Sequence, residues 1–60
     1  MISKAEFEAV LQFEIRARDH YDKILAEVKH PEVRKRIESI RDDEVRHIEL
    51  ARRMLSLLCA

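Results

Sequence analysis

The second half of the chain carries a regular stripe of apolar positions that predicts one long helix. The stripe advances in alternating steps of four and three residues, which is the spacing of a single helix face. We therefore predict a helix over about residues 31–58. Two positions of the stripe, Glu44 and His47, are polar and able to bind a metal. Its other members are apolar: Val33, Ile37, Ile40, Ala51, Met54 and Leu58.

The first half of the chain predicts a second helix, over about residues 4–29. Ser3 and Glu6 match the capping box that begins many helices. The apolar positions that follow form one wide arc at about 100° per residue, and Glu14 lies near its middle. This arc is wider than one neighbouring helix can cover, which is typical of a helix in a bundle.

The segment between these helices is the only break in the helical pattern. Pro31 disfavours a helical conformation at His30 and suits the first position of a new helix. Lys29 is then expected to lie at the negative end of the first helix. The turn, at 29–31, is short, so the two helices should pack antiparallel. Residues 1–60 are expected to form one domain, an all-α two-helix hairpin.

Size and charge narrow the choice of partners. A hairpin of 60 residues buries little apolar surface, so we expect it to need a partner chain, a metal or both. Basic and acidic residues number 12 each, which argues against nucleic acid or a membrane surface as the main partner. No apolar run approaches the roughly 20 residues that span a membrane. The N-terminus shows no signal peptide and the single Cys59 suits a reducing compartment, so we expect a cytoplasmic protein.

The register of the hairpin brings three metal-competent residues to one height. With this turn, residues whose numbers add to about 59 lie level. Glu14 is then level with Glu44 and His47, roughly 22 Å from the turn, and all three side chains are expected to point inward. A divalent metal would neutralise such carboxylates through oxygen and nitrogen ligands. Two chains around a two-fold axis would supply four glutamates and two histidines, the ligand set of di-iron four-helix bundles.

These residues give the chain a resemblance to half of a ferritin-like protein. Glu14 and Tyr21 are spaced as in the Glu-x6-Tyr pattern of rubrerythrins, and Glu44 and His47 resemble their Glu-x2-His pattern. The chain is most similar to the encapsulated ferritins, whose subunits are two-helix hairpins that form an iron site between two chains. The similar run covers residues 20–47, with matching gaps.

The resemblance implies that the hairpin dimerises into a ferritin-like four-helix bundle that holds two Fe²⁺ ions at its interface. It implies that Glu14, Glu44 and His47 are metal ligands and catalytic residues. Glu44 would bridge the ions, Glu14 would be a terminal ligand, and His47 would bind one iron. The hydroxyl of Tyr21 would orient a carboxylate.

The reaction that the resemblance implies is a ferroxidase reaction, in which O₂ or peroxide oxidises Fe²⁺ to Fe³⁺. The implied partners are a second copy of the chain in a homodimer, further copies in a larger homo-oligomer, and an encapsulin shell. The last of these would place the protein inside a nanocompartment.

Other functions stay open on the sequence alone. A rubrerythrin-like peroxide reductase is a variant of the same class, and Mn²⁺ or Zn²⁺ would share the ligands of Fe²⁺. A different class is a non-catalytic helical dimerisation module, in which a buried Glu/His polar layer fixes the register. In that case Glu14 would pair with Arg18 or with an arginine of the partner, Glu44 would form a salt bridge along its helix, for example to Arg41, and His47 would be a core histidine.

Overall fold

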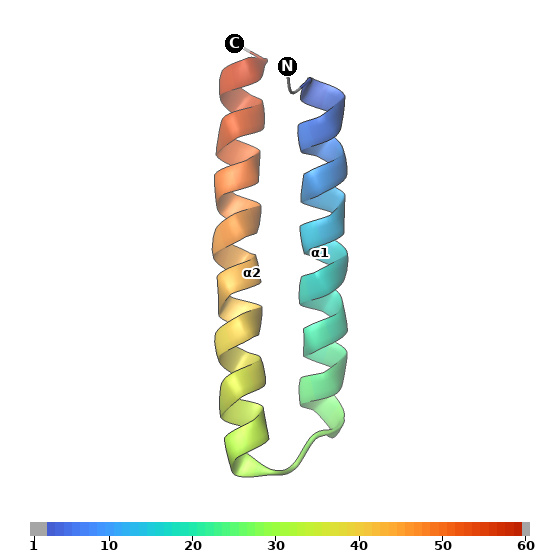
Figure 1. Cartoon of the computed structure of the whole chain (residues 1–60), viewed down its shortest axis with the longest axis vertical. Coiled ribbons are helices and arrows are strands. Elements are labelled where there is room, and N and C mark those ends of the chain that lie inside the picture. The colour runs from blue at the N-terminus through green and yellow to red at the C-terminus, as the bar shows by residue number, and fades with distance from the viewer. Residues whose placement is uncertain (1–2, 60) are drawn as a thin grey trace.

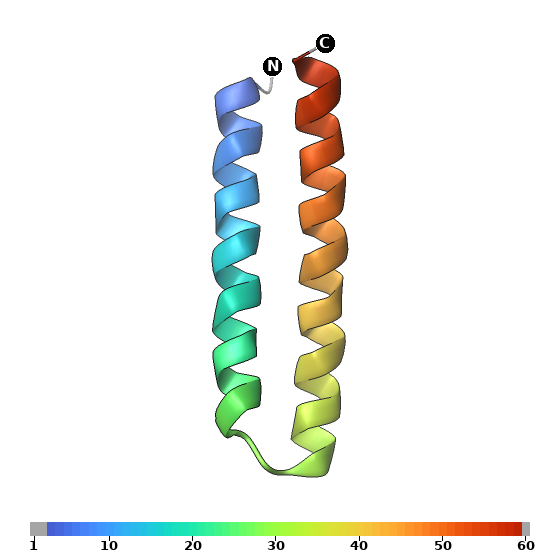
Figure 2. The ribbon, with the colours of Figure 1, turned by 180° about the vertical axis from the view of Figure 1, so that it is seen from behind.

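The computed structural model, which describes residues 3–59, is a hairpin of two long helices. Helix α1 spans Lys4–Glu27 and helix α2 spans Pro31–Leu58. The two helices lie side by side and antiparallel, and both chain ends lie at the end of the hairpin opposite the turn (Figure 1, Figure 2). The molecule measures 44 × 16 × 14 Å. The predicted all-α hairpin is confirmed.

Both helices begin where local chemistry predicts. The Ser3 hydroxyl accepts a hydrogen bond from the Glu6 amide at 3.2 Å, and the Glu6 carboxylate accepts one from the Ser3 amide at 3.3 Å. This reciprocal pair is the expected capping box. Pro31 is the first residue of α2, and the preceding His30 caps the helix because its Nδ1 accepts from the Val33 amide at 3.5 Å.

The predicted end of the first helix was wrong by two residues. Helix α1 ends at Glu27, and Val28 is already extended, with φ −73° and ψ 132°. Lys29 therefore lies outside the helix and does not occupy its last turn. Arg34 of α2 takes that role, because its guanidinium donates to the carbonyl oxygens of Leu25 and Val28. These contacts satisfy carbonyl groups that a helix end leaves without partners.

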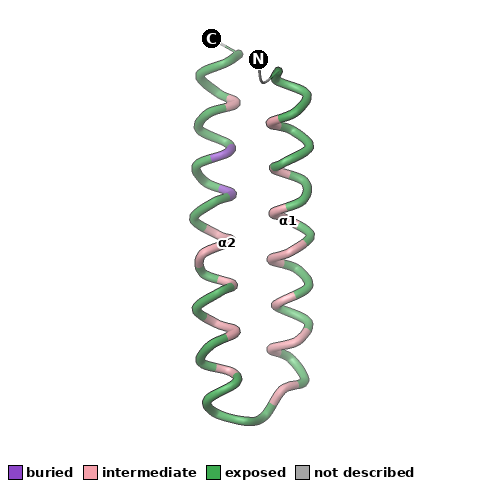
Figure 3. Tube along the Cα trace, in the orientation of Figure 1, coloured by how far each residue is buried: buried purple, intermediate pink, exposed green. Residues whose placement is uncertain are grey.

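The core of the single hairpin is small. Among the described residues only Ile48 and Ala51 are buried, with 2% and 3% of their surface exposed. Partly buried positions follow the side of each helix that faces the other helix, and the outward sides are exposed (Figure 3). Neither helix within residues 3–59 combines the length and apolarity that crossing a membrane requires.

Most of the exposed large apolar side chains lie on one side of the hairpin, which we call the apolar face, whereas the exposed Leu50 and Leu57 lie outside it. The two helices are antiparallel. Residues displaced in the same rotational sense from the helix–helix contact of each helix therefore lie on the same side of the hairpin. Charged residues such as Arg34 and Arg41 lie on the other side of the helix contact, the polar face, from which their guanidinium groups reach residues of the first half of the chain. At 100° per residue, the apolar face comprises the exposed Val10, Phe13, Val33, Ile40, Met54 and Leu58 and the partly buried Ala17 and Ile24.

The hairpin exposes more surface than a folded monomer of its mass. Its accessible surface is 4955 Å², whereas a monomeric protein of 7.2 kDa is expected to expose about 4100 Å². The excess, about 800 Å², equals the area that each partner contributes to a standard protein–protein interface. Phe13 is one of the apolar residues that contribute to this exposed surface, since 75% of its own surface is exposed.

Candidate metal centre

Three side chains with metal-binding atoms meet halfway along the hairpin. Glu14 comes from the middle of α1, and Glu44 and His47 come from the middle of α2. One ligand atom from each residue can be chosen such that all lie within 4.8 Å of one another. Glu44 and His47 share a face because they are three residues apart on a helix. The predicted register, which placed Glu14 level with this pair, is confirmed.

The three side chains differ in their exposure to solvent. The Glu14 side chain is 23% exposed, whereas the His47 side chain is 54% exposed. Glu44 is half-buried. The prediction that all three point inward therefore holds for the two glutamates and was wrong for His47 in the single chain. His47 lies at the edge of α2 that borders the apolar face, so the cluster opens towards that face.

One carboxylate oxygen of the cluster has no partner. Glu44 Oε2 is buried and makes no hydrogen bond with any of the residues 3–59. A buried acceptor without a partner is costly, and the cost is larger when the group carries charge. The site therefore favours a proton or a cation at this oxygen.

The pKa of Glu44 also indicates that the site favours a proton or a cation. The hydrogen bond that a protonated Glu44 would donate to the carboxyl group of Glu14 raises the pKa of Glu44, and burial and the charge of Glu14 raise it further. The neighbouring His47 acts in the opposite direction and lowers this pKa. Two close carboxylates resist joint ionisation. A divalent cation between them would remove that conflict.

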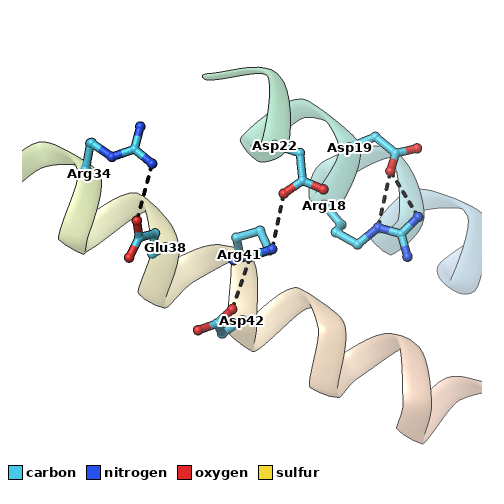
Figure 4. A network of polar contacts seen from close by, with 7 residues as sticks. All are labelled: Arg18, Asp19, Asp22, Arg34, Glu38, Arg41 and Asp42. Carbon is cyan, nitrogen blue, oxygen red and sulfur yellow. Dashed lines mark hydrogen bonds and ion pairs between the residues drawn. The ribbon is translucent and has the colours of Figure 1, made fainter. Parts of the chain in front are cut away.

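The arginines that could neutralise the two glutamates are bound elsewhere. Arg18 donates to the Asp19 carboxylate at 3.0 and 3.2 Å. Arg41 lies 3.4 Å from the carboxylate of Asp22, across the hairpin, and 3.0 Å from that of Asp42 (Figure 4). The pairings of Glu14 with Arg18 and of Glu44 with Arg41 are thus not formed.

The cluster has one internal ion pair. Nδ1 of His47 lies 3.7 Å from Oε2 of Glu14, and the pair carries opposite charges when the imidazole is protonated. The sequence placed these residues level but gave no sign that they would pair directly. A metal that bound both groups would replace this contact, because metal ligands must be deprotonated.

Tyr21 and Asp43 are the remaining candidates for the surroundings of the cluster. Tyr21 is half-buried, and its hydroxyl makes no hydrogen bond with other residues in the part of the chain that the structure describes. Its role in orienting a carboxylate stays a prediction. Asp43, next to Glu44, forms an ion pair with Arg46 on the outer side of α2. Asp43 therefore does not join the cluster in the single chain.

The chain matches no family model, and comparison with curated proteins and with solved structures also gave no match. Chemical interpretation of the site therefore depends on its geometry. Two carboxylates and one imidazole form an oxygen and nitrogen ligand set that suits Fe²⁺, Mn²⁺ or Zn²⁺. Three ligands leave coordination positions open for a second chain, water or an oxidant.

Proposed function

We propose that the protein is a di-iron carboxylate protein that oxidises Fe²⁺ to Fe³⁺ at a site shared by two chains. The observation that carries this proposal is the cluster of Glu14, Glu44 and His47, in which a buried oxygen of Glu44 has no partner. The donor set fits iron. The ferritin-like spacing of these residues with Tyr21 supports a ferroxidase over a purely structural metal site.

The exposed apolar face supports the second half of this proposal, a homodimer. Pairing two hairpins through this face would cover the excess of about 800 Å² per chain, the usual contribution of one partner to an interface. It would also bring two clusters together as four glutamates and two histidines, arranged in a four-helix bundle. Dimerisation would then complete both the hydrophobic core and the set of metal ligands.

In this site each residue has a distinct role. Glu44 of each chain would bridge two metal positions, Glu14 would be a terminal ligand, and His47 would bind through one ring nitrogen. Tyr21 would orient a carboxylate by hydrogen bonding. Fe²⁺ is the substrate: it gives up one electron to O₂ or peroxide, which is reduced. The carboxylates would hold the higher charge of the Fe³⁺ product.

A second function has one observation in its favour. The contact between His47 and Glu14 neutralises part of the cluster without any metal. The cluster could then be a polar layer that fixes the register of a non-catalytic helical dimer. This alternative predicts that replacing the glutamates leaves every activity unchanged, because there would be none to lose.

The setting that we propose for this chemistry is the cytoplasm, inside a protein nanocompartment formed by an encapsulin shell. The ferritin-like resemblance supports the shell. The lone Cys59, which is free and exposed, suits a reducing compartment.

The test of the proposed reaction is the rate of Fe³⁺ formation in air, followed by near-ultraviolet absorbance. The wild-type chain should oxidise Fe²⁺ well above the rate without protein, and Glu44→Ala should reduce the rate to that background. Glu49→Ala is the matched control, because Glu49 is an exposed glutamate on the same helix outside the cluster. Equal rates for all three proteins would refute the ferroxidase.

A further inference from the structure

Arg41 and Glu44 of α2 each hold one buried polar atom that makes no hydrogen bond with any of the described residues. The Nε of Arg41 is a donor without an acceptor, and the Oε2 of Glu44 is an acceptor without a donor. The two residues are three apart, so they lie on one face of the helix and their side chains can reach each other. A guanidinium bound to this carboxylate would form a charge-assisted hydrogen bond, which is among the strong hydrogen bonds of proteins.

Two aspartates hold Arg41 away from Glu44. The Nη1 of Arg41 donates to the carboxylate of Asp22 on α1 at 3.4 Å, and its Nε lies 3.0 Å from the carboxylate of Asp42 (Figure 4). The contact with Asp42 is an ion pair without the geometry of a hydrogen bond, since Nε makes none with residues 3–59. Asp22 is therefore the residue that anchors Arg41 through a hydrogen bond, and it does so from the other helix.

Arg41 and a metal ion would compete for the same oxygen of Glu44. An arginine paired with Glu44 would have to leave before a cation could bind there, so chains in the paired state would not be competent to bind metal. An anchor that favours the unpaired state raises the competent fraction and thereby the apparent affinity for the metal. Asp22 can act in this way from outside the cluster, because it is not one of the three clustered residues.

We propose that Asp22 is a positioning residue, which holds Arg41 away from Glu44 and so keeps the metal cluster open to cations. This inference rests on the metal site of the proposed function and adds a residue that sets its affinity. The side chains of Arg41 and Asp22 are 33% and 48% exposed, so water and salt screen their ion pair less than a fully exposed one. Loss of the Asp22 carboxylate frees the guanidinium to bind Glu44 instead.

The affinity of the full chain for Fe²⁺, measured by calorimetry without oxygen, tests this role. Asp22→Asn should weaken binding at least about fivefold, since hydrogen bonds between charged groups are strong. Arg41→Gln removes the competing cation and should tighten binding. The double variant Asp22→Asn/Arg41→Gln should bind Fe²⁺ as Arg41→Gln alone does, because Asp22 then has no arginine to hold. Such a double-mutant cycle isolates the coupling between the two residues.

Glu38→Gln is the matched control for the lost charge. Glu38 is also a carboxylate paired with an arginine, but its partner Arg34 lies ten residues from Glu44 along α2 and donates to the carbonyl of Leu25. This variant should leave the affinity for Fe²⁺ unchanged. Circular dichroism and thermal melts without metal verify that each variant is helical and folded, and the mass in solution verifies that all variants are compared in the same oligomeric state.

Two other roles of Asp22 predict different results, and either result would overturn the inference. If the ion pair only joined the two helices, Asp22→Asn and Arg41→Gln would both weaken the binding of Fe²⁺. If Asp22 only attracted cations through its charge, Asp22→Asn would weaken binding equally with and without Arg41. An affinity that no variant changes would also overturn the inference.

The outcomes separate this inference from the proposed function. Opposite effects of the two single variants, with no effect of Asp22→Asn in the Arg41→Gln chain, support the role of Asp22, whether or not the protein oxidises Fe²⁺ in air. A chain that oxidises Fe²⁺ but shows no coupling between the two residues overturns the inference and leaves the ferroxidase standing. A chain that binds no Fe²⁺ overturns both together.

Discussion

His47 Nδ1 and Glu14 Oε2 lie 3.7 Å apart, although the two residues belong to different helices. This contact, with Glu44 beside it, joins the middle of α1 to the middle of α2, where Glu14 and Glu44 interrupt the apolar positions of the two helices. The cluster is therefore a polar layer inside an apolar seam. Whether a metal or a proton neutralises it determines the stability of the hairpin and its chemistry.

The raised pKa of Glu44 predicts how stability depends on pH in the metal-free protein. The folded chain holds this proton to a higher pH than the unfolded chain, in which a glutamate has its ordinary value near 4.5. The stabilisation from this proton is complete below pH 4.5 and is lost as the pH rises through the folded pKa. Glu44→Gln cannot ionise, so its melting temperature should exceed that of the wild type at pH 7.

Thermal melts at pH 4 and pH 7, with a chelator present, measure this effect. The advantage of Glu44→Gln should be larger at pH 7 than at pH 4. The prediction would be wrong if the difference in melting temperature were equal at both pH values. It would also be wrong if the wild type became more stable relative to the variant as the pH rises. Either result would show that folding does not raise the pKa of Glu44. Added Fe²⁺ without oxygen should reverse the order, because ligand binding stabilises only the chain that retains its site.

Arg34 is predicted to hold the turn end of the hairpin together. Its guanidinium donates to the carbonyl oxygens of Leu25 and Val28, and hydrogen bonds from charged donors contribute about 1.5–3 kcal/mol. Arg34→Ala should therefore lower the free energy of unfolding by about 1–3 kcal/mol. Urea unfolding followed by circular dichroism measures the change.

Arg36→Ala is the matched control for this prediction. The Arg36 side chain is 76% exposed and pairs with Glu32, one turn away on the same helix. Exposed pairs of this type contribute about 0.3–0.5 kcal/mol. If Arg34→Ala cost no more than Arg36→Ala, the capping role of Arg34 would be wrong.

If the apolar face forms the proposed dimer interface, a charge placed on it should weaken the dimer. Met54→Glu places a carboxylate on this face, where a dimer would bury it without a partner. We expect the dimer dissociation constant to rise at least about tenfold, which corresponds to 1.4 kcal/mol. Ser56→Glu adds the same charge on the same helix outside this face. Sedimentation over a range of concentrations should give a weakened dimer for the first variant and an unchanged one for the second.

Local chemistry was sufficient to predict the frame of the hairpin. The capping box of Ser3 and Glu6 and the proline at the start of α2 act over a few residues, so the sequence shows them directly. The height of Glu14 relative to Glu44 and His47 follows from helix rise and turn length alone. The predicted fold of one chain and the meeting of these residues are both confirmed.

Features that depend on contacts between the helices were not predicted. The sequence suggested Lys29 for the end of α1, but Arg34 reaches that end from the other helix. Arg18 and Arg41 were possible partners of the glutamates, but aspartates nearby bind them instead. The exposure of His47 depends on how α2 rotates against α1. Hydrophobic spacing does not specify these choices among neighbouring charged groups.

An anaerobic Fe²⁺ titration of the purified chain tests for the shared di-iron site, with binding and mass in solution measured on the same samples. We expect saturation near one iron per chain, the ratio of a di-iron site shared by two chains, together with a dimeric mass. Glu44→Gln should lose this saturation, and Glu49→Gln should retain it. A stable dimer without saturable iron binding would refute the di-iron site, and the cluster would then be a polar layer in a structural module.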